Sequence, residues 1–200
     1  MLTNIYRIIT LQELAQLART VIGLIDAIYL HWTAGRYNQV FDDYHLNIGQ
    51  DGQLYLTCSA LTDFKEHTWH RNSRSIGISL CCAYAAKCYD IGAELPLISY
   101  GSFGPTPRQI EAMAQATAVI TQELGMEISP ATVLTHQEAA SLDGYGPNSQ
   151  DPETRWDLWY LPDLPSTISL GPGGNILRGK AIWYRHHPDA LFRTPPPLSC

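Results

Sequence analysis

The stretch "YLHWTAG", Tyr29 to Gly35, places a histidine where a β-prone run meets a loop. The residues before the histidine, "AIYL", are apolar and rich in β-branched and aromatic types, which predicts a strand that ends at His31. A histidine at the tip of a strand is either a buried hydrogen-bonding residue or a metal ligand held on a rigid element. One such residue does not separate the two interpretations.

A second run, "ATVLTH", repeats the pattern and ends in His136. Ligand sites in open α/β sheets lie beyond the carboxyl ends of the strands, so two imidazoles on neighbouring strands could share one zinc ion there. Zinc in a hydrolytic site usually takes three protein ligands and one water molecule, and we expect the third ligand to be a carboxylate. The downstream candidates are Asp143, Asp151 and Asp157. Spacing alone leaves a purely structural role for both histidines open.

The remaining pattern predicts helices and strands in alternation. Thr10 and Glu13 form a capping box that starts a helix, and "YHLNIGQDGQLYL" is typical of a hairpin that turns at Asp51 and Gly52. The apolar stripe expected on this first helix consists of Leu11, Leu14, Ala15, Ala18 and Ile22.

Further along the chain, "SIGISLCCAYA" is continuously β-prone and predicts a buried central strand. Thr106 caps a helix that has Pro107 at its first position and ends at Gly125. The inner face of this helix should carry Ile110, Met113, Ala114, Thr117, Ile120 and Leu124. Together these elements predict an α/β fold, a single domain with a mixed central β-sheet flanked by helices. We expect the catalytic domain in residues 1–165, and in residues 166–200 a C-terminal extension that packs on the domain or stays partly mobile.

Composition excludes several classes of protein. The chain has 200 residues, 45% of them hydrophobic, and its net charge of -6 with no cluster of Lys and Arg argues against nucleic acid as a partner. The five cysteines contain no CxxC spacing, so neither a disulfide framework nor a thiolate zinc site is expected. No run of about 20 apolar residues predicts a membrane span, and the first residues lack the pattern of a signal peptide.

Four segments, "LHWTAG", "YHLNIGQDGQLYL", "HTWHRNSRSIGISL" and "VLTHQEA", occur in this order between about Ile28 and Leu161. In this order they resemble the motifs of the zinc-dependent N-acetylmuramoyl-L-alanine amidases, the amidase-2 family shared with peptidoglycan recognition proteins and phage endolysins. The resemblance implies the fold of that family, with Zn²⁺ as cofactor and peptidoglycan or muropeptides as substrate. It implies hydrolysis of the amide bond between N-acetylmuramic acid and L-alanine.

The resemblance also implies roles for individual residues. His31 and His136 match the zinc histidines, and Tyr44 matches the tyrosine that assists catalysis in the phage enzymes. His67 and Asn72 match positions in the family's cleft. Trp32 and Trp69 are aromatic residues near these motifs and are expected to contact the glycan-peptide substrate.

The third zinc ligand follows from the family pattern of a lysine, one spacer residue, and then Asp or Cys. Here the pattern reads Arg155, Trp156, Asp157, which makes Asp157 the expected ligand and Arg155 the substitute for the lysine. Asp151 is the rival because a proline follows it, and Asp143 is a weaker candidate. Arginine donates hydrogen bonds to an oxyanion but does not supply a proton. We therefore expect Tyr44, or the water bound to the zinc itself, to take the role of general base.

The leading hypothesis is a bacteriolytic amidase of the phage or prophage endolysin type. We expect it to be a monomer that is made in the cytoplasm and acts on the cell wall after holin-type release. A cytoplasmic amidase that recycles anhydromuramyl peptides is the close variant. A recognition module that binds peptidoglycan without cutting it is the alternative from another class. The basic residues Arg178, Lys180, Arg185 and Arg193 of the extension would either touch the anionic wall or cap the sheet.

Overall fold

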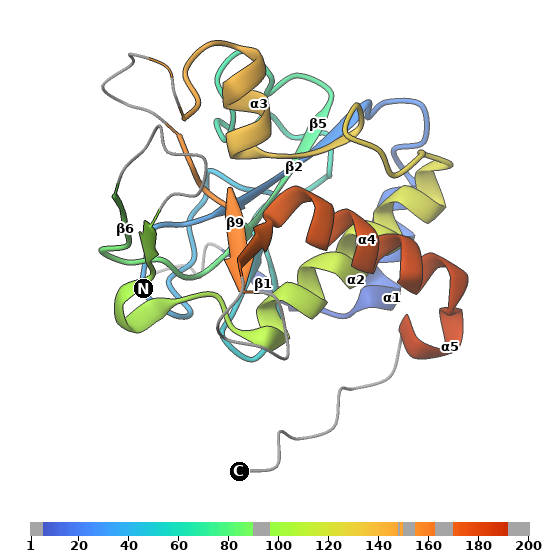
Figure 1. Cartoon of the computed structure of the whole chain (residues 1–200). Helices are drawn as coiled ribbons and strands as arrows, with labels where there is room; N and C mark the ends of the chain where they lie inside the picture. The colour runs from blue at the N-terminus through green and yellow to red at the C-terminus, as the bar shows by residue number, and fades with distance from the viewer. Residues whose placement is uncertain (1–5, 90–96, 148, 150–154, 163–169, 192–200) are drawn as a thin grey trace, which may run out of the picture.

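The computed structural model describes residues 6–89, 97–147, 149, 155–162 and 170–191. Within these residues the main sheet has six strands in the order β1-β4-β3-β5-β2-β8 (Figure 1). The strands are β1 Arg7–Ile9, β2 Ala27–Trp32, β3 Leu46–Ile48, β4 Leu54–Leu56, β5 Ser75–Leu80 and β8 Val133–Thr135. Two short pairs lie outside this sheet and consist of β6 Lys87–Tyr89 with β7 Leu97–Ser99, and β9 Tyr160–Pro162 with β10 Leu170–Pro172.

The sheet is mixed, as predicted. Strand β2 runs parallel to both β5 and β8, and β3 runs parallel to β5. The hairpin β3–β4 is antiparallel, as is the pair β1–β4. Because β2, β3, β5 and β8 point the same way, their carboxyl ends meet at one edge of the sheet, where α/β proteins place their ligands.

The two faces of the sheet are chemically different because side chains alternate along each strand. On one face the side chains are apolar and belong to the main hydrophobic core with α1 Leu11–Arg19 and α2 Pro107–Leu124. The opposite face of β2 and β5 carries Tyr29, His31, Ser75, Gly77 and Ser79. The buried polar groups of the candidate site therefore belong to the face that the main core does not cover.

The first helix begins as the sequence predicts. Thr10 accepts a hydrogen bond from the backbone of Glu13, and the Glu13 side chain accepts one from the backbone of Thr10. The helix ends at Arg19, however, and Ile22 lies in the turn that follows with 58% of its surface exposed. The prediction that Ile22 continues the apolar stripe is therefore wrong, because the chain leaves the helix before reaching it.

The second long helix agrees with its predicted signals. Thr106 and Gln109 form a capping box around Pro107, and Gly125 ends the helix in the left-handed region with φ 63. Its buried side supports β5, the strand predicted to be central, which is buried along its whole length. Figure 1 shows α1, α2 and α4 on one side of the molecule, away from α3 His136–Leu142.

The described part of the C-terminal extension packs on the rest of the chain. Strand β10 pairs with β9, and α4 Gly173–His186, followed by α5 Pro188–Leu191, packs against α2. Arg178 is buried and binds Glu138 with distances of 2.7 and 2.8 Å, while Lys180 contacts Glu111. These basic side chains are thus used within the fold, which favours a packed extension over one that contacts the wall. Arg193 lies outside the described residues, and the division at residue 165 stays a prediction.

In the part of the chain that the structure describes, no helix combines the length and the apolar character needed to cross a bilayer.

Candidate metal centre and cleft

The two histidines predicted to share a metal come from adjacent strands. Strands β2 and β8 pair in parallel with Leu30 opposite Thr135, so His31 and His136 each follow a paired residue. His136 does not extend the strand as predicted but is the first residue of α3. Thr135 caps that helix by accepting a hydrogen bond from the backbone of Glu138. The capped helix start fixes the direction in which His136 leaves the sheet edge.

Three ligand atoms converge at this edge. The Nδ1 atoms of His31 and His136 are 3.2 Å apart, and Asp157 places Oδ2 at 3.3 Å from the first and Oδ1 at 3.2 Å from the second. In a tetrahedral zinc site with bonds of about 2.0–2.1 Å, ligand atoms lie about 3.3 Å from one another. Two imidazole nitrogens and a carboxylate whose two oxygens each approach one of them form a donor set that fits a zinc ion.

Asp157 reaches the histidines from a segment distant in sequence. Its carboxylate is buried, and its backbone carbonyl accepts a hydrogen bond from Gln137 at 3.4 Å. The next residue, Leu158, has φ 60 and is fully buried. A leucine in the left-handed region costs roughly 1–2 kcal/mol, so the packing of this turn stabilises an otherwise unfavourable backbone that directs Asp157 inward.

Burial and mutual contact hold these groups in the protonation states that zinc requires. The pKa of His31 is lowered to about 4, chiefly by burial; the hydrogen bond with Asp157 opposes this shift and the nearby His136 adds to it. Burial alone would raise the pKa of Asp157, but the contacts with His136 and His31 outweigh it and hold the pKa below its usual range. At neutral pH the site therefore offers a neutral imidazole on His31 and an ionised carboxylate, and metal ligands must be deprotonated in this way.

The rival carboxylates differ in their surroundings. Asp143 forms a bidentate ion pair with Arg71 at 2.5 and 2.7 Å and is not part of the converging group. Asp151 lies outside the described residues.

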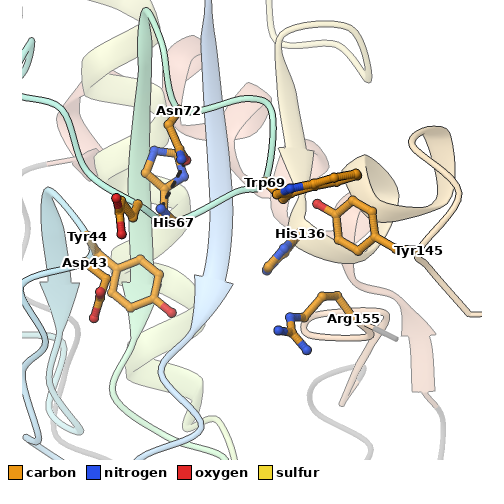
Figure 2. A pocket seen from close by; sticks show the side chains of 9 residues that line it. Asp43, Tyr44, His67, Trp69, Asn72, His136, Tyr145 and Arg155 are labelled. Atoms are coloured by element: carbon orange, nitrogen blue, oxygen red, sulfur yellow. Dashed lines mark hydrogen bonds between the residues drawn. The ribbon is translucent and has the colours of Figure 1, made fainter. Parts of the chain in front are cut away.

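A cleft opens beside the three converging residues. One cavity of about 700 Å³ and another of about 340 Å³ share Tyr44, His136 and Arg155 in their walls, and Asp157 lines the smaller one. In Figure 2, Tyr44, Asp43 and His67 lie on one side of the larger cavity, and Trp69, Tyr145 and Arg155 lie on the other side with His136. The candidate metal centre thus sits where the two cavities meet.

Tyr44 lies close to the centre, with its ring centroid 5.1 Å from that of His31 and its hydroxyl 3.4 Å from the carbonyl of Trp32. Burial raises the pKa of Tyr44 well above its ordinary value, and the negative charge of Asp157 adds to this effect. The phenol therefore stays protonated at neutral pH. This favours hydrogen-bond donation by Tyr44 over the general-base role that we considered from the sequence.

The residues predicted to contact substrate have different surroundings. Trp69 is 59% exposed on the cleft wall, and its ring meets the edge of Tyr145 at 5.4 Å. Trp32 is buried against Trp156 and borders only the smaller cavity. Asn72 borders the larger cavity, but its side-chain oxygen accepts hydrogen bonds from the backbone of residues 67 and 68 and so organises the loop.

His67 is 5% exposed and belongs to a cluster of histidines under the cleft. The pKa of His67 is lowered to about 2, mainly by burial and in smaller part by the nearby His31, His45 and His136. Its ring lies directly over Gly77, where a Cβ atom would be 2.6 Å from its Cγ. The glycine of the strand is thus required by the close approach of this imidazole.

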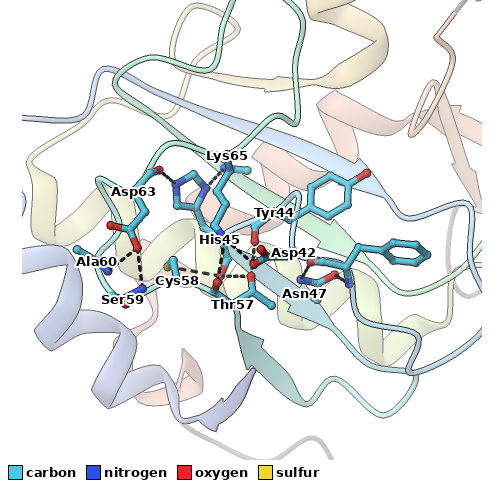
Figure 3. Close-up of polar contacts among 12 residues, drawn as sticks. Asp42, Tyr44, His45, Asn47, Thr57, Cys58, Ser59, Ala60, Asp63 and Lys65 are labelled. Carbon is cyan, nitrogen blue, oxygen red and sulfur yellow. Dashed lines mark hydrogen bonds and ion pairs between the residues drawn. The ribbon is translucent and has the colours of Figure 1, made fainter. Parts of the chain in front are cut away.

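His45 forms the far end of the cluster. Its Nδ1 accepts a hydrogen bond from the backbone of Gly77 at 3.0 Å, and its Nε2 donates to the carbonyl of Asp63 at 2.8 Å (Figure 3). It is fully buried and ties β3 to β5 and to the loop after β4.

Sequence reasoning missed one polar residue of the site, Thr68. Its hydroxyl contacts both His31 and His67 although nothing in the sequence pattern marks it. Only its position directly after His67 could have drawn attention to it. Glu138, two residues after His136, caps α3 and forms an ion pair with Arg178.

Comparison with known proteins agrees with this geometry. The family profile described as N-acetylmuramoyl-L-alanine amidase matches residues 22–154. The chain therefore belongs to the N-acetylmuramoyl-L-alanine amidase family, which confirms the family and the enzyme class expected from the sequence motifs. The match includes His31 and His136 and stops short of Asp157.

Several solved structures resemble the chain at low identity. The Ph2119 endolysin from a Thermus scotoductus bacteriophage is 15% identical, with 90% of this chain and 91% of that chain covered and a TM-score of 0.43. The amidase LysC from Clostridium intestinale is 15% identical, with 58% and 72% covered and a TM-score of 0.40. The Apis mellifera recognition protein PGRP-SA is 14% identical, with 66% and 89% covered and a TM-score of 0.40. At such scores these likenesses add no weight to the family match. Among curated proteins, none matches the sequence.

Proposed function

We propose that the chain is a zinc-dependent peptidoglycan amidase in which His31, His136 and Asp157 hold the ion. The observation that supports this proposal is the convergence of three ligand side chains beside an open cleft: the two Nδ1 atoms lie 3.2 Å apart, and the two oxygens of Asp157 lie 3.3 Å from His31 and 3.2 Å from His136. The reaction is hydrolysis of the bond between the lactyl carbonyl carbon of N-acetylmuramic acid and the nitrogen of L-alanine. Water supplies the new oxygen on carbon, and the alanine amine leaves with a proton.

A zinc ion in such a site polarises the scissile carbonyl and lowers the pKa of a water molecule to about 7. The chain's own groups complete the chemistry around it. Arg155, on the wall shared by both cavities, donates hydrogen bonds to the oxygen on which negative charge develops. The protonated hydroxyl of Tyr44 donates from the opposite side of the cleft. One well-placed donor of this kind contributes about 3–4 kcal/mol to the stability of the transition state.

The cleft walls suit a ligand that is partly sugar and partly peptide. Trp69 and Tyr145 offer an aromatic surface on one side, and aromatic faces stack on the apolar faces of sugar rings. Asp43 lies on the other side of the larger cavity, which Glu66 also lines, and both carboxylates offer hydrogen-bond acceptors to peptide amides. We propose that the glycan lies over the aromatic wall and that the stem peptide leaves toward the acidic one.

We further propose the endolysin role that the sequence motifs imply, in which the enzyme attacks the intact wall and lyses the cell. A comparison of rates on intact sacculi and on soluble anhydromuramyl peptides tests this role. Faster turnover of sacculi fits an endolysin, whereas activity confined to the soluble peptides fits a recycling amidase.

The decisive experiment measures zinc content together with the products of sacculus digestion by mass spectrometry. We expect one zinc ion per chain and release of stem peptides with a free L-alanine amine. Asp157→Ala should lose both zinc and activity, whereas the matched change Asp151→Ala should keep both. Binding of muropeptides without zinc and without cleavage would instead identify a recognition module. Retention of zinc by Asp157→Ala and its loss by Asp151→Ala would move the third ligand to Asp151.

A further inference from the structure

A chain of hydrogen bonds leads away from the metal centre into the protein. The Nε2 atom of His31, on the side of the ring opposite the converging Nδ1 atoms, lies 3.2 Å from the hydroxyl of Thr68. The same hydroxyl lies 2.9 Å from Nδ1 of His67. The Nε2 atom of His67 lies 3.3 Å from the hydroxyl of Ser75, which donates to the carbonyl of Arg71 at 2.8 Å.

Only one arrangement of protons satisfies every link when Nδ1 of His31 carries a metal. Nε2 of His31 must then hold the ring proton, so it donates to Thr68. The single hydroxyl proton of Thr68 points to Nδ1 of His67, which accepts it. His67 therefore carries its own proton on Nε2 and donates to Ser75. The chain ends at a backbone carbonyl, which accepts hydrogen bonds in every case.

The middle of this chain is held firmly in place. Thr68 is 1% exposed, and its backbone N–H donates to the side chain of Asn72 at 2.7 Å. The ring of His67 packs on Gly77 without room for a Cβ atom between them. Because both neighbours are fixed, the hydroxyl of Thr68 has a defined position relative to the His31 ring.

We propose that Thr68 is a positioning residue, which fixes the tautomer and the ring orientation of His31 so that Nδ1 faces the metal. His67 and Ser75 extend this support, so His67 serves the metal centre through Thr68 in addition to bordering the cleft. The inference rests on the proposed zinc site.

The test compares zinc affinity in the full chain and three variants by competition with a chromophoric chelator. Thr68→Val keeps the shape of the side chain and removes the hydroxyl, and we expect zinc affinity to fall by about 10–100-fold, as it does when such outer partners are lost. Thr68→Ser retains the hydroxyl and should restore most of the affinity. Thr117→Val is the matched control, because Thr117 is also buried but donates to the carbonyl of Met113 within α2. It should bind zinc as the unchanged protein does.

A second readout is the tautomer of each histidine, measured by nitrogen NMR on the zinc-loaded protein. We expect the ring proton on Nε2 in both His31 and His67 of the unchanged chain, and a mixture of tautomers for His67 in Thr68→Val. Equal zinc affinity of Thr68→Val and the unchanged chain would overturn the role of Thr68 alone. Failure of the unchanged chain to bind zinc would overturn the proposed function as well. If Thr68→Val does not fold, a proton on Nδ1 of His67 in the zinc-loaded unchanged chain overturns the proposal.

Discussion

The Nδ1 atoms of His31 and His136 lie 3.2 Å apart although 105 positions separate the two residues in the sequence. They meet because β8 pairs with β2 in parallel, so the ligand pair exists only when this part of the sheet is formed. An ion that binds this pair binds the folded state and not the unfolded chain. Zinc binding and folding should therefore be coupled.

This coupling predicts that zinc stabilises the protein. At a free zinc concentration of 100 times the dissociation constant, the free energy of unfolding should rise by about 2.7 kcal/mol. Thermal unfolding with and without a chelator measures the effect. Asp157→Asn should abolish the zinc-dependent part of the shift, whereas Asp143→Asn, which alters the ion pair with Arg71, should retain it. A zinc-dependent shift that survives Asp157→Asn would count against this ligand.

Arg155 should influence turnover without influencing metal binding. It lines both cavities but is not among the three converging ligands. If it donates to the developing oxyanion, Arg155→Gln should lower kcat by roughly 100- to 1,000-fold. Arg155→Lys should recover part of this loss because it keeps the charge but not the planar pair of donors. Steady-state kinetics and zinc content of the same preparations check the prediction, and a parallel loss of zinc would contradict it.

Gly77 should not tolerate a side chain, because a Cβ atom there would lie 2.6 Å from Cγ and 2.7 Å from Cδ2 of His67. We expect Gly77→Ala to destabilise the protein by about 1–3 kcal/mol, the usual cost of overpacking. The double variant with His67→Ala should show a smaller cost for the added methyl group than the single change does. Gly179→Ala is the control, since that position in α4 has open space for a methyl group. We expect this variant to be slightly more stable than the unchanged protein.

The fold and the two metal-site histidines could be predicted from the sequence because both have local signals. Capping boxes at Thr10 and Thr106 predict the starts of α1 and α2, and a continuous β-prone run predicts β5, each from a few neighbouring residues. Thr68 has no such signal, since its role depends on contact with the imidazole of His31, which lies 37 positions away in the sequence. Ile22 shows the opposite failure: it keeps the helical period, but the chain has already turned. Contacts that depend on tertiary packing are therefore the features of the fold and the site that sequence periodicity does not predict.

The pairing of Arg178 with Glu138 should make the C-terminal helix necessary for stability. The Arg178 side chain is only 7% exposed and also donates to the carbonyl of Val133 in β8. Arg178→Met leaves the partly buried Glu138 without its partner, and we expect a loss of about 3 kcal/mol. Arg19→Met removes a bidentate pair with Glu123 on the surface and should cost much less. Urea denaturation of both variants tests this contrast, and equal losses would contradict it.

His45 should make stability depend on pH. Burial lowers its pKa from 6.5 to about 4, with Lys65 lowering and the contacts with Asp63 opposing the shift. Between these two values the unfolded chain binds a proton that the folded chain excludes, so the free energy of unfolding falls as the pH falls from about 6.5 to about 4. The slope from this one group reaches about 1.4 kcal/mol for each pH unit. Protonation of Nδ1 would also break the hydrogen bond from Gly77.

The variant His45→Gln separates this effect from other titrating groups, because glutamine keeps a side-chain donor and acceptor but does not titrate. Urea midpoints measured at pH 7, 6, 5 and 4 in the presence of a chelator should show a smaller slope in the variant than in the unchanged chain. The difference should vanish above about pH 7, where the imidazole is neutral in both the folded and the unfolded state. Identical slopes at every pH would mean that His45 gains its proton without opposing the fold, and the buried hydrogen bonds to Gly77 and Asp63 would then have to rearrange.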